Sequence, residues 1–314
     1  MLGRTAHGLF WMFRYLERAE NTARLLNAGL RMALTRDLST AEDEWRSVIA
    51  TLALQSQYEA ANDDYSGAKV WNFILRDKDN PSSIRSMFGA VRTNARMGRN
   101  AISGDLWEAI NESWIQLDEK LSRPVGQGAV GDVVRMVRRA ATMVHGAMDG
   151  SKLRDEGYHF GRAGTFIERA DSTARILDMK YYLLLPSLNY VGSSLDTGQW
   201  ESVLRSVAGD HVFSWLNAGQ IHAHGIVEFL VLDDRFPRSL AFCHGALRDN
   251  LTALARLHGT EGKSNEFMRE TDIELNEMTT EQIFDRGLHE FLTDYMASHA
   301  KIASAISEDY RFLS

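Results

Sequence analysis

Cysteine is almost absent from this 314-residue chain, in which Cys243 stands alone. A single cysteine excludes an intramolecular disulfide framework and a metal site built from several thiolates. Cys243 directly follows Ala241 and Phe242, and a lone cysteine among apolar neighbours is typically a small core hydrophobe rather than a nucleophile. One free cysteine fits a reducing compartment without requiring one.

Proline and long apolar runs are also scarce. With only 4 prolines, against roughly 5% in average usage, long helices are able to continue without interruption. The apolar run at residues 9–13 stops at Arg14, and no stretch reaches the roughly 18 to 20 residues that a transmembrane helix needs. Nothing resembles a cleavable signal peptide. We therefore expect a cytoplasmic protein.

The chain also lacks a strong charge of either sign and any pattern typical of strands. Its formal net charge of −7 argues against nucleic-acid binding through global attraction, and leaves only a local basic patch open. No window shows sustained alternation of polar and apolar residues, and the β-branched residues are scattered among helix formers. The sequence therefore predicts an all-α fold.

One charged segment occurs twice. YLERAENTARLL at 15–26 returns as FIERADSTARIL at 166–177, 151 positions later. Three further blocks recur in the same order: WRSVI at 45–49 as WESVL at 200–204, the spaced residues Phe73, Asp77, Pro81 and Ser83 as Phe229, Asp233, Pro237 and Ser239, and GAVRTN at 89–94 as GALRDN at 245–250. The offset grows from 151 to 156, which indicates one small insertion, expected in the loop after Pro186. We predict a tandem duplication, with residues 1–150 and 151–314 as two pseudo-equivalent helical bundles packed together.

The first helix is predicted over about residues 6–34. Its first half is apolar on several sides, which is typical of a helix at the centre of its bundle. Ser39 and Glu42 form a capping box for a second helix over about 42–62. The other helices of the first half are expected over about 65–76, 83–100, 106–121, and from the loop at 122–128 to about residue 149.

Charged residues of the repeat form the candidate site. Glu20 precedes Arg24 by four positions, which is a favourable order for an ion pair on one helix face, and Asp171 and Arg175 repeat it. The later blocks at 89–94 and 245–250 add the one charged position that they share. The candidate cluster therefore contains Glu17, Arg18, Glu20, Arg24, Arg92, Glu168, Arg169, Asp171, Arg175 and Arg248.

Acids and bases that recur together are expected to be partners. We predict that Glu17 pairs with Arg92, and that Glu168 pairs with Arg248, across a helix interface. One interpretation is structural, because buried ion pairs set the register between helices even at a net cost in stability. The alternative is a ligand-binding cluster.

Four arginines of the block around residue 92 fall on one helix face: Arg85, Arg92, Arg96 and Arg99. Guanidinium groups in such a stripe suit phosphate or carboxylate groups. A solvated or docking face is the simpler interpretation. The second copy keeps only Arg248 of the four, so anion binding by both halves is not supported.

Metal and nucleotide motifs are weak. Glu156 and His159 have the spacing of a di-iron ligand pair, but such a site needs a second pair and two further carboxylates. GTEGKS at 259–264 lacks the glycine spacing and the preceding strand of a P-loop. The sequence therefore predicts no metal and no cofactor.

The opening MLGRTAHGLFWMFRYLERAENTARLL resembles the bacterial alpha-E family, predicted helical proteins named for an ER motif, and FIERADSTARILDMKYYLLLP resembles the second ER segment of that family. The resemblance covers essentially the whole chain and implies that Glu17-Arg18 and Glu168-Arg169 are the motif pairs. It also implies partners, because such proteins are commonly found beside, or fused to, circularly permuted ATP-grasp enzymes and transglutaminase-like proteins. That association points to a system that forms peptide or amide bonds.

Two functions from different classes follow. In the first, the chain is a non-catalytic helical partner that docks an ATP-grasp ligase or holds its substrate. In the second, both halves enclose a polar pocket in which Glu17, Arg18 and their repeats bind a small peptide or activated carboxylate and carry out transfer or hydrolysis. A packed and paired cluster favours the first function, and a concave pocket with perturbed pKa values favours the second.

Overall fold

The protein is helical throughout the part that the computed structural model describes, which is residues 1–34, 38–183 and 194–312. These residues form fifteen α-helices, a 3-10 helix and a π-helix, and no strand occurs among them. The all-α prediction is confirmed. No helix in the described ranges combines the length and hydropathy needed to cross a membrane.

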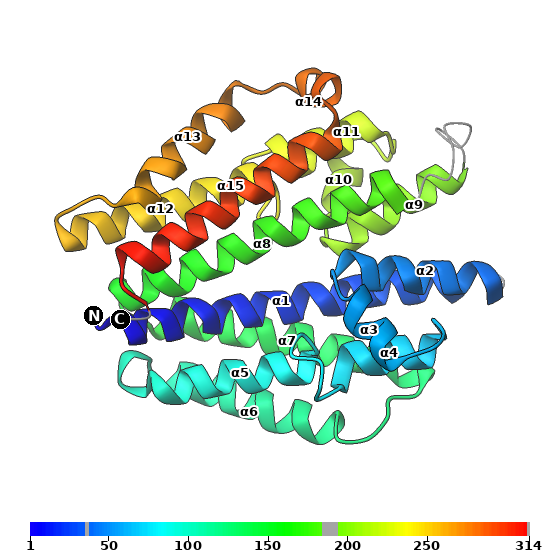
Figure 1. The fold of residues 1–314 in the computed structure, drawn as a ribbon, viewed down its shortest axis with the longest axis horizontal. Helices are drawn as coiled ribbons and strands as arrows, with labels where there is room; N and C mark the ends of the chain where they lie inside the picture. Colours follow the sequence, from blue (N-terminus) through cyan, green and yellow to red (C-terminus); the bar gives the residue numbers. More distant parts are fainter. Residues whose placement is uncertain (35–37, 184–193, 313–314) are drawn as a thin grey trace.

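Two long helices lie side by side at the centre of the molecule, α1 (Gly3–Leu34) and α8 (Glu156–Leu183), and they share the largest helix–helix contact (Figure 1). Side chains on several sides of α1 are buried, among them Leu9, Phe10 and Phe13. The predicted central position of the first helix is therefore correct. Both repeated charged segments, which we call the ER segments (residues 15–26 and 166–177), lie on this central pair.

A glycine allows the two central helices to approach closely. A Cβ atom added at Gly164 of α8 would lie 2.2 Å from the carbonyl oxygen of Phe10 in α1. No side chain fits at that distance, so the backbones are in direct contact there. The close approach brings the ER segments within reach of each other.

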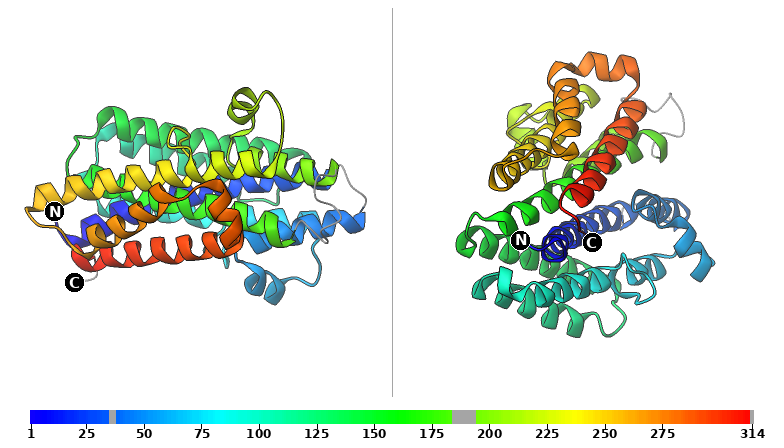
Figure 2. Two further views of the ribbon diagram at one scale, coloured as in Figure 1. Left: turned by 90° about the horizontal axis from the view of Figure 1, so that it is seen from above. Right: turned by 60° about the vertical axis from the view of Figure 1, so that its left-hand side comes forward.

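The remaining helices cover the two sides of the central pair. On one side, α5 and α7 pack on α1 and α6 packs on both of them, with bounds α5 (Ile84–Met97), α6 (Gly104–Lys120) and α7 (Gln127–Ser151). On the other side, α12 and α15 pack on α8 and α13 packs on both of them, with bounds α12 (Leu240–His258), α13 (Lys263–Glu277) and α15 (Leu288–Asp309). Figures 1 and 2 show these two sets on opposite sides of α1 and α8.

Shorter helices complete the ends. In the first half they are α2 (Leu38–Thr51), α3 (Gln55–Ala61), α4 (Gly67–Arg76) and the 3-10 helix η1 (Arg99–Ala101). In the second half they are α9 (Ser194–Ser206), α10 (Asp210–Leu216), α11 (Ala223–Val227), the π-helix η3 (Glu228–Leu232) and α14 (Thr280–Arg286). The start of α1 meets the turn that follows α15, since a Cβ atom at Gly3 would lie 2.0 Å from the carbonyl oxygen of Arg311.

Most predicted helices are found near their expected ends, with one exception. The helix predicted over 42–62 begins earlier, at Leu38, and its predicted cap, the side chain of Ser39, lies outside the described side chains. It is also interrupted at 52–54, where Ala53 adopts a left-handed backbone conformation (φ 55°). The expected insertion after Pro186 lies outside the described residues.

Candidate functional site

The two ER segments exchange ion pairs. Arg169 of α8 binds the Glu17 carboxylate of α1 with two hydrogen bonds, from Nε to Oε1 (2.8 Å) and from Nη2 to Oε2 (2.9 Å). In return, Arg18 of α1 binds Glu168 of α8, with Nη2 donating to Oε2 (3.0 Å) and Nε contacting Oε1. Glu17 of the first segment is therefore paired with the arginine of the second segment, and Glu168 of the second is paired with the arginine of the first.

Each of these carboxylates also has a second arginine. Nη1 of Arg238 donates to Oε1 of Glu17 (3.0 Å), and Nε of Arg14 donates to Oε2 of Glu168 (2.9 Å). Glu17 and Glu168 are only 0% and 2% exposed. Burying a carboxylate is costly unless it is paired and hydrogen-bonded, and each carboxylate here meets that condition twice.

The predicted partners of these glutamates are wrong. Nε of Arg92 donates to Oδ1 of Asn111 on α6 (2.8 Å), and Nη1 of Arg248 binds Asp272 on α13 (2.9 Å). Both arginines point from their helices toward the outer layer. The glutamate of each ER segment is paired with the arginine of the other segment, across the interface between α1 and α8.

The predicted pairs within each helix are present. Nε of Arg24 donates to Oε1 of Glu20 (2.9 Å), and Nε of Arg175 donates to Oδ2 of Asp171 (2.7 Å). These pairs need only helical spacing, which a local pattern predicts well.

One central residue, Arg238, was missed by sequence reasoning. It lies just before α12 and is 9% exposed, and its guanidinium group also binds Asn21 Oδ1 (2.6 Å) and Glu20 Oε1 (3.0 Å). Its backbone carbonyl accepts a hydrogen bond from Thr173 of α8 (2.8 Å). Arg238 stands between two repeated residues, Pro237 and Ser239, but it is not itself repeated, so a search for shared charges passes over it.

The arginines keep both central carboxyl groups ionised. Burial alone would raise the pKa of Glu17, but the guanidinium groups of Arg169 and Arg238 outweigh it and hold that pKa well below its ordinary value. Burial opposes ionisation of Glu168 in the same way, and Arg18 and Arg14 lower its pKa nonetheless. A general acid or base needs a pKa near the working pH. Neither carboxyl group is suited to proton transfer at neutral pH.

The arginines are charged as well. Burial tends to lower the pKa of Arg169, and the Glu17 carboxylate raises it. Burial lowers the pKa of Arg238, which lies beside both Arg169 and Arg24. The ordinary pKa of a guanidinium group lies above about 12, so Arg238 still carries its positive charge at neutral pH.

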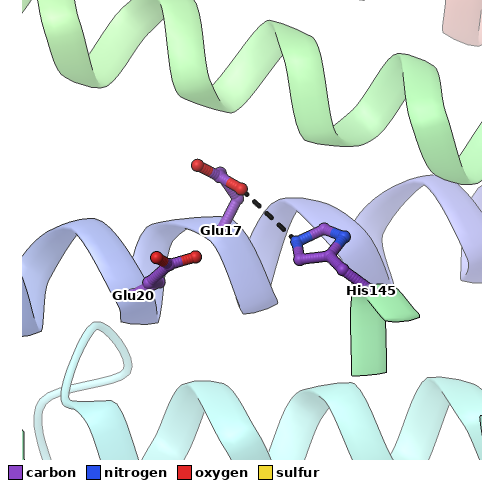
Figure 3. A group of neighbouring side chains, drawn as sticks. All are labelled: Glu17, Glu20 and His145. Atoms are coloured by element: carbon purple, nitrogen blue, oxygen red, sulfur yellow. Dashed lines mark ion pairs between the residues drawn. The ribbon is translucent and has the colours of Figure 1, made fainter. Parts of the chain in front are cut away.

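A histidine adjoins this network, which raises the question of a metal ion. Figure 3 shows Glu17, Glu20 and His145 together, and one ligand atom from each lies within 4.8 Å of the others. Nε2 of His145 is 3.5 Å from Oε2 of Glu17. The carboxylate oxygens already accept hydrogen bonds from Arg169 and Arg238, and a metal ion would have to sit beside these two cations. The donor set does not fit a metal.

The other candidate residues serve the packing. Three of the four arginines of the predicted stripe contact α6 or the turn before it: Arg85 binds Asp118, Arg92 binds Asn111, and the Arg99 guanidinium lies 5.7 Å from the centre of the Trp107 ring. Glu156 and His159 have different partners, since His159 meets Asn250 while Glu156 meets the N-terminal amine. Burial raises the pKa of the Cys243 thiol to about 12, which leaves it protonated.

A cavity lies against the charged residues of the second ER segment. It has a volume of about 220 Å³ and lies between α1, the corner that follows α2, and α8. The charged residues around it are Arg18, Glu168, Asp171 and Arg175, and Ser82, Ser172, Leu25, Leu54 and Ile176 are among its other walls. The cavity thus offers both signs of charge beside an apolar wall.

Comparisons with known proteins agree with the resemblance to a family that has an ER motif. A family model, Alpha-E, described as a predicted alpha-helical domain with a conserved ER motif, matches residues 1–311. Three proteins described as uncharacterized are each 25% identical to this chain over 280 residues: Mb2597 of Mycobacterium bovis, and MT2643 and Rv2567 of Mycobacterium tuberculosis. The matched region is 83% of this chain and 30% of each relative. No solved structure matches the chain significantly. The chain belongs to the Alpha-E family.

Proposed function

We propose that this chain is a non-catalytic helical protein that holds a substrate for, or docks onto, an ATP-grasp ligase that forms peptide or amide bonds. The observation that carries the non-catalytic part is the reciprocal exchange of ion pairs between Glu17–Arg169 and Glu168–Arg18. Groups locked in a buried, fully paired network hold helices in register. They are poorly placed to gain and lose protons during a reaction.

We also infer that the chain arose by tandem duplication and consists of two helical bundles, residues 1–150 and 151–314. The reciprocal ion pairs support this inference, as do matching helix corners. Ala53 and Ala208 both have a φ of 55°, and the next residue in each case, Leu54 or Gly209, donates its N–H to the carbonyl five positions earlier. This bond closes a Schellman motif, normally built with glycine.

The partner part of the proposal rests on the family and on chain length. Alpha-E proteins are associated with ATP-grasp and transglutaminase-like proteins, and such a ligase activates a carboxylate with ATP. The matched region is 30% of the length of each mycobacterial relative, which fits a module that works alongside another part of a chain. We propose a cytoplasmic location for this system.

An enzyme is the second candidate, and the cavity of about 220 Å³ is the observation that favours it. Transfer or hydrolysis of a small peptide there would need a proton-transfer group. Glu168 is held ionised by Arg18 and Arg14, and Asp171 is bound to Arg175 through both of its oxygens. The cavity is therefore better suited to binding than to catalysis.

Co-purification tests the proposed function. The chain is expressed with the ATP-grasp protein encoded beside it, and ATP turnover is measured with and without this chain. We expect a stable complex, turnover that depends on this chain, and no turnover by this chain alone. Absence of a complex, together with intrinsic turnover by this chain, would overturn the proposal.

A further inference from the structure

The loop that carries Arg238 has a counterpart in the first half. Asp77 and Asp233 each accept a hydrogen bond at Oδ1 from the N–H two residues later (2.9 Å in both). Ser83 and Ser239 each cap the next helix, with their hydroxyl oxygens accepting from the N–H three residues later (3.2 and 3.0 Å). The position between cap and proline is Ser82 in the first loop and Arg238 in the second.

The surroundings of these two positions correspond as well. Arg238 reaches three residues of the first ER segment, Glu17, Glu20 and Asn21. The residues at the same places in the second ER segment are Glu168, Asp171 and Ser172. All three line the cavity of about 220 Å³, and so does Ser82. The cavity therefore lies where an arginine side chain from position 82 would extend.

Each of the two glutamates accepts three hydrogen bonds from two arginines, but these bonds are divided differently between the two carboxylate oxygens. Oε2 has two contacts in each case, from Arg169 and His145 at Glu17, and from Arg18 and Arg14 at Glu168. Oε1 of Glu17 accepts from Arg169 and Arg238, and at 3.4 Å also from Nδ2 of Asn21. Among the described residues, Oε1 of Glu168 receives only the Nε of Arg18. Oε1 of Glu168 can therefore accept a further donor, at the place where Arg238 donates to Glu17 on the other side.

The charges around the cavity limit the kind of ligand that could donate a hydrogen bond to Oε1 of Glu168. Three guanidinium groups, from Arg14, Arg18 and Arg175, bind the two carboxylates of Glu168 and Asp171. The guanidinium groups already outnumber the carboxylates, so a ligand that carries only a positive charge would add to the excess of positive charge. Arg18 and Arg175 both line the cavity, and a guanidinium group has five N–H donors, so each has donors left for a carboxylate.

We propose that this cavity binds a small zwitterion, an amino acid or the end of a peptide. Its ammonium or guanidinium group takes the place that Arg238 has on the other side, against Glu168, Asp171 and Ser172. Its carboxylate faces Arg18 and Arg175. The volume is below the roughly 300 to 1,000 Å³ of drug-sized sites and fits a ligand of amino-acid size. This inference extends the proposed substrate-holding function. It rests on that function only where it identifies the bound ligand as a substrate of the ligase.

Isothermal titration calorimetry with the full chain tests the inference, using L-arginine, L-alanine, agmatine and glutarate. We expect L-arginine to bind at least about tenfold more tightly than agmatine, which lacks the carboxylate, and than glutarate, which lacks the cation. Equal binding of L-alanine and L-arginine would assign the donor to the α-ammonium group. Binding of L-arginine alone would assign it to the side chain, and both results support a zwitterion site.

The matched variant is Ser82→Arg, which places in the cavity the side chain found at position 238. We expect it to weaken L-arginine binding at least about tenfold without lowering thermal stability, while Ser214→Arg, on an exposed residue of α10, changes neither. If Ser82→Arg does not fold, Asp171→Asn takes its place and is expected to weaken binding similarly.

Three results would overturn the inference: no binding of either amino acid at millimolar concentration, binding that Ser82→Arg and Asp171→Asn leave unchanged, or agmatine or glutarate binding as tightly as L-arginine. Failure here together with a stable ATP-grasp complex would leave the proposed function standing. Amino-acid binding without such a complex would support the inference and count against the proposed function.

Discussion

At the scale of single residues, local spacing and long-range pairing differ in how far the sequence predicts them. The pairs Glu20–Arg24 and Asp171–Arg175 follow from one turn of helix and are present. The partners of Glu17 depend on how helices far apart in the sequence are arranged, which no local pattern contains. Arg238 could not be predicted for a further reason. Only charged residues shared by the repeated blocks were taken as candidates, and Arg238 has no charged counterpart in the first half of the sequence.

The titrating residues predict how stability depends on pH. The pKa values of Glu17 and Glu168 are lowered in the folded protein, so their contribution to stability is present above the unfolded value near 4.5 and is lost as pH falls below it. Burial lowers the pKa of His244 to about 4, and it lowers that of its neighbour His299 from 6.5 as well. Because these histidines take up protons more readily when unfolded, stability also declines as pH falls below about 6.5.

We therefore expect the free energy of unfolding to fall in two stages on acidification, gently from about pH 6.5 and steeply from about pH 4.5. Urea denaturation between pH 8 and pH 3, followed by circular dichroism, measures it. Stability that stays constant or rises between pH 6.5 and pH 5 would contradict the neutral buried histidines. A flat profile below pH 4.5 would contradict the paired glutamates.

At the scale of elements, the helices were predicted well and one corner was not. Apolar periodicity located α5, because periodicity is a local signal, and Ser83 caps this helix in the structure. The break between α2 and α3 has neither glycine nor proline, since alanine occupies the left-handed position at residue 53. That corner forms one wall of the cavity, so the cavity could not be predicted either.

The contact between the central helices gives a prediction at this scale. Gly164→Ala would bring a methyl group to 2.2 Å from the Phe10 carbonyl oxygen, so the helices must move apart. We expect a loss of about 1 to 3 kcal/mol in the free energy of unfolding. The control is Gly146→Ala in α7, where an added Cβ meets nothing within 4 Å, and where alanine is expected to stabilise the helix by about 0.5 to 1 kcal/mol. Similar effects of the two substitutions in urea denaturation would argue against a direct backbone contact.

At the scale of the whole molecule, the charges that define the motif join the two central helices, α1 and α8. The reciprocal pairs account for a glutamate and an arginine next to each other in both segments, because each segment supplies one acid and one base to the other. Arg238 binds Glu17 of the first ER segment, whereas a cavity of about 220 Å³ lies beside Glu168 of the second. The repeat predicted that the charges belong together, and the arrangement of the helices determined which ones meet.

The most direct test of this structural role is the free energy of unfolding of Glu17→Gln, measured by urea denaturation at pH 7. The substitution removes the negative charge that Arg169 and Arg238 share and leaves both guanidinium groups buried. We therefore predict that the free energy of unfolding falls by about 3 to 5 kcal/mol. The control is Glu201→Gln, which breaks the exposed pair with Arg205 in α9 and is expected to cost at most about 0.5 kcal/mol. If Glu17→Gln destabilises the protein no more than Glu201→Gln does, and instead abolishes the function of the ligase system, the charges form a working site and the structural account is wrong.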